Sequence, residues 1–108
     1  MSQPSMNVIG LISGTSVDGI DGVVASIQGE GYNLQVATLG GQTFDYPPAI
    51  RQQALAIGAG AAISMPELAA LDEAIAQQFA QAAQALIDQY GPVNLIGSHG
   101  QTVFHLPL

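Results

Sequence analysis

The amino-acid sequence predicts an α/β domain with a mixed sheet, built from three meandering strands, a helical crossover and a returning parallel strand. Three observations predict this fold class. Short apolar runs separated by turn residues occupy the first part of the chain, a long stretch of helical periodicity follows Ser64, and one more apolar run comes directly after that stretch. A strand that follows a long helix returns most naturally beside an earlier strand and parallel to it. The 108 residues fit one small domain.

The first two strands are expected at residues 7–13 and 19–28. NVIGLIS, at 7–13, is a continuous apolar run of the kind found in strands that are buried on both faces. A turn at Val17-Asp18-Gly19 separates it from GIDGVVASIQ, and Asp-Gly between two apolar runs predicts a hairpin of antiparallel strands. After a second turn at 29–31, apolar and polar residues alternate over 32–38, which predicts a third strand with one wetter face.

Two helical segments are expected next, at 49–57 and after Ser64. A pair of prolines ends the strands, because proline donates no hydrogen bond to a ladder. Ser64 and Glu67 have the spacing of a capping box. Apolar residues then recur mostly at three- and four-residue steps as far as Tyr90, and Gly91 provides a stop signal. The sequence therefore predicts an amphipathic helix of about seven turns.

The returning strand is expected at 93–98, followed by a polar loop at 99–102 and the start of one more strand at 103–106. All the helical segments lie in one crossover, so they can cover only one face of the sheet. We therefore expect either that the chain is the front part of a larger protein or that it hides its bare sheet face by self-association.

The charge balance excludes several functional classes. Eight acidic residues stand against a single base, Arg51, and the net charge is -7. Binding to nucleic acid or to an anionic membrane surface needs several Lys or Arg, so neither is expected. The chain has no Cys, which rules out disulfides, thiolate zinc sites and a Cys nucleophile. No apolar run approaches the roughly 18 residues of a membrane span and no targeting segment is recognised, so we expect a cytoplasmic protein.

The first candidate site is the run GTSVDGID. It comprises Gly14, Thr15, Ser16, Val17, Asp18, Gly19, Ile20 and Asp21. Its backbone N–H groups can point into one concavity, and the hydroxyls of Thr15 and Ser16 can donate to the same anion, which suits a phosphate. Because the chain has no Lys, the usual lysine-based phosphate loop is ruled out, and Asp18 or Asp21 would instead hold a metal ion, directly or through water. The simpler alternative is a tight hairpin with two solvated aspartates.

A serine-hydrolase elbow is disfavoured at this run. The G-x-S-x-G pattern needs glycine where Asp18 stands, and a strand rather than a helix follows.

The second candidate site comprises His99, Gly100, Gln101 and Thr102. It follows a predicted parallel strand, and open α/β sheets bind ligands just outside the carboxyl ends of their strands. The polar side chains suit a sugar or another polyhydroxylated ligand. The alternative is a histidine that hydrogen-bonds its own loop, and a metal site built from His99 and His105 is disfavoured because nothing nearby completes it.

Together the two candidate loops resemble a known family. "IGLISGTSVDGIDGVVASI" at 9–27 and "IGSHGQTVFHLP" at 96–107 are similar to the amino-terminal motifs of the anhydro-N-acetylmuramic acid kinases, which belong to the actin, hexokinase and Hsp70 ATPase superfamily. The likeness also extends through the intervening long helix and so covers nearly the whole chain. Either motif alone would be weak, but the two at this separation and in this order are specific. One small departure is Ile12, where the family commonly has Met.

The resemblance implies a ribonuclease-H-like half-domain, in which residues 1–108 form the amino-terminal part of the first actin-like ATPase lobe and the second lobe is absent. It implies an ATP-dependent kinase of cell-wall recycling, which opens the 1,6-anhydro ring of anhydro-N-acetylmuramic acid with water and phosphorylates the 6-hydroxyl. The hairpin at 14–21 would face ATP and Mg²⁺, and the loop at 99–102 would lie on the sugar side of the cleft.

The resemblance also sets a limit on activity. The family's catalytic aspartate lies in a downstream motif that this chain does not reach, so we assign no catalytic residue here. Because phosphoryl transfer depends on positioning between two walls of a cleft, we expect the 108 residues alone to be inactive. The alternative, from a different class, is a non-catalytic module that binds itself or a partner protein, and we expect a homo-oligomer.

Overall fold

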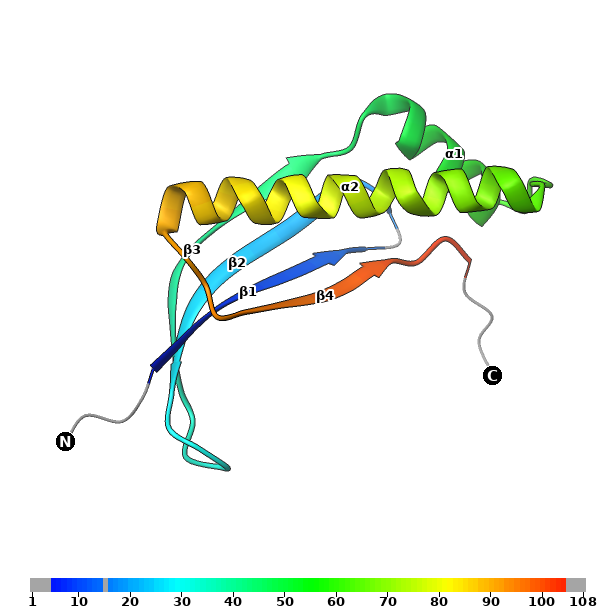
Figure 1. Cartoon of the computed structure of the whole chain (residues 1–108). Helices are drawn as coiled ribbons and strands as arrows, with labels where there is room; N and C mark the ends of the chain where they lie inside the picture. Colours follow the sequence, from blue (N-terminus) through cyan, green and yellow to red (C-terminus); the bar gives the residue numbers. More distant parts are fainter. Residues whose placement is uncertain (1–4, 15, 105–108) are drawn as a thin grey trace.

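The strands form one four-stranded mixed sheet in the order β3-β2-β1-β4, with both helices on the same side (Figure 1). The structure, a computed structural model, describes residues 5–14 and 16–104. Its elements are β1 (Ser5–Ser13), β2 (Gly19–Gln28), β3 (Gln35–Asp45), α1 (Pro48–Gly58), α2 (Met65–Tyr90) and β4 (Leu95–Gln101). β1 pairs antiparallel with β2 and parallel with β4, and β2 pairs antiparallel with β3. The predicted fold class, meander and parallel return are confirmed.

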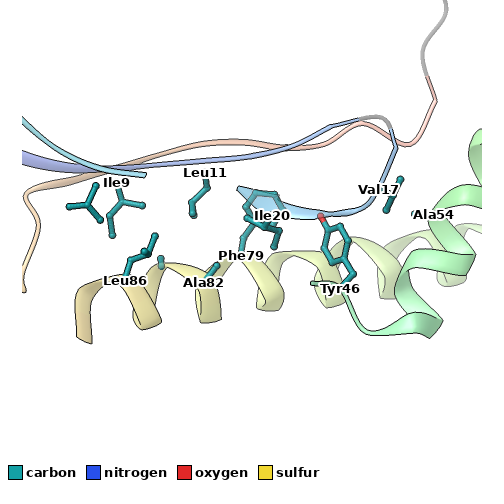
Figure 2. Close-up of a cluster of buried hydrophobic side chains, with 11 residues drawn as sticks. Ile9, Leu11, Val17, Ile20, Tyr46, Ala54, Phe79, Ala82 and Leu86 are labelled. Carbon is teal, nitrogen blue, oxygen red and sulfur yellow. The ribbon is translucent and has the colours of Figure 1, made fainter. Parts of the chain in front are cut away.

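The core lies between the sheet and α2. Alternate residues of β1 and β2 point to the helix, including Ile9, Leu11 and Ile20, and Phe79 and Leu86 of α2 pack against them (Figure 2). Each fully buried side chain of this size contributes about 1.5 to 3 kcal/mol. The predicted apolar stripe of the long helix is therefore core.

The capping box predicted for the long helix is present. The Glu67 N–H donates to Ser64 Oγ over 3.2 Å, and the Ser64 N–H donates to Glu67 Oε1 over 3.3 Å. The helix runs 26 residues to Tyr90 and is followed by Gly91 at φ 95°. Among the helices that the structure describes, none is both long enough and apolar enough to cross a membrane.

The opposite face of the sheet carries exposed apolar side chains. Met6, Ile12, Val23 and Leu95 are 44%, 47%, 41% and 57% exposed. Between β2, β1 and β4 this face holds a shallow depression of about 340 Å³, lined mainly by apolar atoms of residues such as Ile12 and Val23. We call this surface the bare face, and it is the face that we expected the crossover helices to leave uncovered.

Two strand boundaries differ from the sequence predictions. The third strand is Gln35–Asp45 rather than 32–38, because it pairs with β2 along the whole of that strand, while Tyr32 is fully exposed. The last strand is Leu95–Gln101 rather than 93–98, because its pairing with β1 continues past Ser98. The predicted loop at 99–102 is thus largely strand.

The strand predicted at 103–106 is not formed where the structure describes it. Val103 and Phe104 lie outside any strand. His105 and Leu106 are outside the described residues.

Candidate functional site

The connection between β1 and β2 begins its turn three residues earlier than predicted. The Val17 N–H donates to the Gly14 carbonyl over 3.1 Å, so the turn spans 14–17 rather than Val17-Asp18-Gly19. Val17 has φ 55° and its side chain is 2% exposed. A β-branched residue is a genuine outlier in this left-handed region, which indicates a conformation held by its surroundings. Thr15 lies outside the described residues.

Gly19 and Ile20 pack against neighbouring residues and do not lie in an open loop. A Cβ at Gly19 would lie 2.6 Å from the Phe44 carbonyl oxygen, so the close approach of β3 requires glycine here. The buried Ser13 hydroxyl donates to the Gly19 carbonyl over 2.7 Å, and Ile20 is buried in the core. These contacts tie both ends of the hairpin to the sheet.

The two aspartates of the hairpin have different surroundings. Asp18 is exposed, and its Oδ1 lies 3.3 Å from Arg51 Nη2, while Arg51 Nε donates to the Val17 carbonyl over 3.0 Å. Asp21 is exposed on β2 and accepts a 2.7 Å hydrogen bond from Thr43 Oγ1. Within residues 5–14 and 16–104 no three His, Asp or Glu side chains gather as a metal cluster.

The second candidate loop meets the first through Gln101. Its Nε2 donates to the Gly14 carbonyl over 2.9 Å, and its Oε1 accepts from the Tyr46 hydroxyl over 3.0 Å. Of its neighbours, His99 is exposed, and Gly100 and Thr102 are half-buried. The structure therefore brings together two motifs that are far apart along the chain, since Gly14 and Gln101 are separated by 87 positions.

Tyr46 is the buried member of this contact. Burial raises its pKa above the ordinary value of 10.0, and the neighbouring Ser13 hydroxyl partly offsets that shift. The phenol is therefore a protonated hydrogen-bond donor at neutral pH, as its bond to Gln101 requires.

Two cavities lie at the end of β4, one lined in part by Gln101 and the other by Thr102. One, of about 320 Å³, lies between α2 and the end of β4 and is lined by residues that include Asp72, Phe79 and Ser98. The other, of about 290 Å³, is bordered by Val17, α1 and the segment that follows β4. The end of β4 thus offers polar groups beside hollowed surface, the arrangement expected of a ligand site in an open α/β sheet.

Sequence reasoning missed three residues that hold the candidate loops: Ser13, Tyr46 and Arg51. Only Arg51 carried a signal, because it is the single Lys or Arg in an acidic chain. Ser13 ends an apolar run and Tyr46 precedes two prolines, and neither local pattern indicates the hydrogen bonds that they make to Gly19 and Gln101.

The order and pairing of the elements define the class of protein first. A three-stranded meander, a helical crossover and a parallel return beside β1 are the arrangement of a ribonuclease-H-like half-domain of the actin-like ATPase class, here incomplete. The family model described as anhydro-N-acetylmuramic acid kinase matches residues 6–108. The chain belongs to the anhydro-N-acetylmuramic acid kinase family, and the resemblance drawn from its two motifs is confirmed.

Individual relatives agree with this assignment. The chain is 58% identical over 103 residues to an anhydro-N-acetylmuramic acid kinase of a Synechococcus species. The matched segment covers 95% of this chain and 27% of that relative. It is 60% identical over 100 residues to an anhydro-N-acetylmuramic acid kinase of Trichormus variabilis, and this match covers 93% of this chain and 26% of that relative. A relative from Gloeothece citriformis is 50% identical over 102 residues, and this match covers 94% of this chain and 26% of that relative. The chain thus spans about a quarter of the length of these relatives.

Proposed function

We propose that this chain is the amino-terminal part of the first lobe of an ATP-dependent sugar kinase. The complete protein would add water across the 1,6-anhydro ring of anhydro-N-acetylmuramic acid and transfer the ATP γ-phosphoryl group to the 6-hydroxyl. The products are N-acetylmuramic acid 6-phosphate and ADP, in the cytoplasmic recycling of cell-wall sugar. The observation that carries this proposal is the hydrogen bond from Gln101 to Gly14, which joins the two family motifs at one edge of the sheet.

The hairpin at 14–21 would bind the phosphates of ATP. Its glycine and hydroxyl residues, Thr15 and Ser16 among them, supply donors for phosphate oxygens. Ser16 is exposed, which is compatible with that role, whereas Gly19 and Ile20 support the hairpin from the sheet.

The residues at the hairpin fit a magnesium ion held chiefly by its substrate. Mg²⁺ usually keeps several waters and takes one or two carboxylates in addition to substrate phosphates. The exposed carboxylates of Asp18 and Asp21 could each supply such a contact, with one oxygen of Asp18 paired to Arg51 and one of Asp21 accepting from Thr43. Mg²⁺ would neutralise charge on the transferred phosphoryl group.

The residues at the end of β4 would lie on the sugar side of the cleft. His99, Gly100, Gln101 and Thr102 provide donors and acceptors for hydroxyl groups. The family's catalytic aspartate is outside these residues, so the 108 residues alone would lack the group that activates water. They would also lack the facing wall of the cleft, and we expect no turnover from them.

The test is phosphoryl transfer by the full-length protein that carries this segment. Incubation with ATP, Mg²⁺ and the anhydro sugar should give a product heavier by one water plus one phosphoryl group in mass spectrometry. Omitting the sugar should abolish ADP release above background. A full-length protein that binds ATP but leaves the anhydro sugar intact would refute the substrate, and one that also fails to bind ATP would refute the kinase.

Residue roles in the hairpin can be tested in the same assay. Ser16→Ala and Asp18→Asn should raise the KM for ATP, and Asp18→Asn should also raise the Mg²⁺ concentration needed for half-maximal rate. Ser5→Ala and Asp88→Asn make the same chemical changes at exposed positions outside the hairpin and should leave both values unchanged. Equal effects at the test and control positions would contradict the assignment.

A second candidate function is a non-catalytic, self-associating module, which the bare face favours. Its exposed apolar side chains and shallow depression are typical of surfaces that become covered. Sedimentation of the 108-residue chain should then show a dimer or larger species, and Ile12→Glu should shift it to monomer. A chain that stays monomeric at all concentrations would remove this candidate. A homo-oligomer of the complete protein is a separate proposal, which sedimentation of that protein tests.

A further inference from the structure

We propose that Gln101 and Tyr46 act as a positioning pair that fixes the phosphate hairpin through the Gly14 carbonyl. We call this set of contacts the Gly14 clamp. The inference rests on the proposed function, and it gives Gln101 a role toward the nucleotide in addition to its place on the sugar side. Gln101 would act on ATP binding through the hairpin backbone rather than by touching the nucleotide.

Both the nitrogen and the oxygen of the Gln101 side-chain amide make hydrogen bonds. Its Nε2 donates to the Gly14 carbonyl and to the Thr102 carbonyl, each over 2.9 Å, while Oε1 accepts from the Tyr46 hydroxyl over 3.0 Å. Both Nε2 protons are therefore used, and Oε1 keeps one lone pair for a further donor. A reversed amide would set its oxygen against the carbonyl oxygens of Gly14 and Thr102, so these two acceptors select the orientation, and the Tyr46 hydroxyl anchors the amide by donating to Oε1.

Tyr46 is held rigidly enough to anchor the Gln101 amide. It is 5% exposed and belongs to the core cluster that also contains Val17 and Ala54. In the view of Figure 2 it lies between Ile20 and Val17 with its hydroxyl directed toward the sheet. A buried phenol with a hydrogen-bond partner has little freedom to turn away, because an unpaired buried hydroxyl costs free energy.

The strand β4 has a local feature that delivers Gln101 to the hairpin. Leu11 of β1 is paired with Ser98, but Ser13 is paired with Gln101, so β4 gains one residue in this interval. Gly100 lies in the interval with φ 78°, a conformation that glycine adopts without steric cost. The bulge therefore re-aims the strand end, as bulges beside functional sites commonly do.

The hairpin needs such support because its turn is strained. Val17 holds φ 55°, which for a β-branched residue persists only when surrounding contacts over-determine it. The turn is held at its start by Gln101 on the Gly14 carbonyl and at its end by Arg51 on the Val17 carbonyl. Since a carbonyl and the following N–H point in opposite directions across a trans peptide, fixing a carbonyl also fixes the direction of the next donor.

The clamp makes a specific prediction for substrate kinetics. Loss of the Gly14 contact should leave the fold in place and loosen the donors that face phosphate. The KM for ATP should therefore rise by about five- to tenfold, the effect of losing roughly one hydrogen bond. In Tyr46→Phe the KM for the sugar should stay within about twofold, since Tyr46 is not among the proposed sugar contacts.

The experiment compares Gln101→Glu, Tyr46→Phe and the double variant in the full-length protein. Gln101→Glu keeps an acceptor for Tyr46 but loses the donor to Gly14, and Tyr46→Phe removes the hydroxyl that anchors the amide oxygen. Because both act through one contact, the double variant should be little worse than the stronger single variant. Gln89→Glu and Tyr32→Phe are matched controls at exposed positions and should leave both KM values unchanged.

A second readout does not depend on turnover. Hydrogen exchange of the peptide that spans 13–19 should become faster in Gln101→Glu and Tyr46→Phe, while exchange in α2 stays unchanged. Unaltered exchange of the hairpin, additive effects in the double variant, or a rise in sugar KM alone in Tyr46→Phe would each overturn the clamp. If the unaltered protein fails to phosphorylate the anhydro sugar, the proposed function fails, and hydrogen exchange still decides whether the clamp exists.

Discussion

Leu86 of α2 packs so closely against Gly22 of β2 that no larger residue fits between them. A Cβ at Gly22 would lie 2.6 Å from Leu86 Cδ1 and 3.1 Å from Leu11 Cδ2. Leu86 is fully buried, so it has no empty space into which to withdraw. A similar approach occurs where the Tyr90 ring lies against Gly40 of β3. Glycines in the sheet thus allow the carboxyl-terminal half of the helix to lie directly on the strands.

We predict that Gly22→Ala lowers the free energy of unfolding by about 1 to 3 kcal/mol, the usual cost of overpacking a core. Urea unfolding measures it. Gly10→Ala is the matched control, because the nearest atom to its added Cβ would be Val23 Cγ1 at an ordinary 3.5 Å. Equal losses from the two substitutions would mean that α2 can shift away from the sheet at little cost.

We predict that Ser64→Ala lowers the free energy of unfolding by about 1 kcal/mol, because the Glu67 N–H loses its acceptor at the start of α2. Gln77→Ala removes an exposed polar side chain from the middle of the same helix. This control should change stability by less than about 0.5 kcal/mol. Urea unfolding compares the two, and a Ser64→Ala protein as stable as the control would show that the capping box is dispensable.

The sequence predicted elements best where the signal is local. Patterns among neighbouring residues predict the capping box at Ser64, the helix that ends at Tyr90 and the hairpin from β1 to β2. The end of β3 at Asp45 was missed, because that strand follows the length of its partner β2 through two glycines that disfavour strands. Pairing with a distant strand overrode the local preference.

The candidate site shows the same division. The hairpin at 14–21 and the residues 99–102 were found from their composition, but the contact between them was not predicted from the residues. It depends on the bulge at Gly100 and on Tyr46, whose hydroxyl reaches Gln101 across 55 positions of sequence. The left-handed residue of the connection is Val17, which no local pattern indicates, because burial of its side chain and the bond from Arg51 hold it there.

We predict an alkaline loss of stability that depends on Tyr46. Burial raises the pKa of its phenol in the folded state above 10.0, so the folded protein retains this proton where the unfolded chain has lost it. The contribution is fully present below pH 10 and is lost as pH rises through the folded-state pKa. The free energy of unfolding should therefore fall less steeply above pH 10 in Tyr46→Phe than in the unaltered protein.

Ultraviolet absorbance of the phenolate provides an independent check on this titration. The difference between the unaltered protein and Tyr46→Phe should contain one phenol that titrates above pH 10. A difference that titrates at or below pH 10 would contradict the burial argument.

We predict that Arg51 supports the hairpin by its hydrogen bond to the Val17 carbonyl more than by its charge. Its ion pair with Asp18 joins side chains that are 44% and 75% exposed, and such pairs contribute about 0 to 1 kcal/mol. The bond from Arg51 Nε to Val17 is made at 3.0 Å to a strained turn. Arg51→Met should therefore raise the KM for ATP in the full-length protein by about three- to tenfold.

Arg51→Lys separates the two explanations, because lysine keeps the charge but lacks the planar fork that reaches Val17 and Asp18 together. If the hydrogen bond matters, lysine should restore little of the lost ATP affinity, and the loss should be the same at low and high salt. If the charge matters, lysine should restore most of it, and the effect of Arg51→Met should shrink as salt screens the pair. Restoration by lysine would therefore assign Arg51 an electrostatic role and leave the Val17 turn to be held by side-chain burial and the Gly14 clamp.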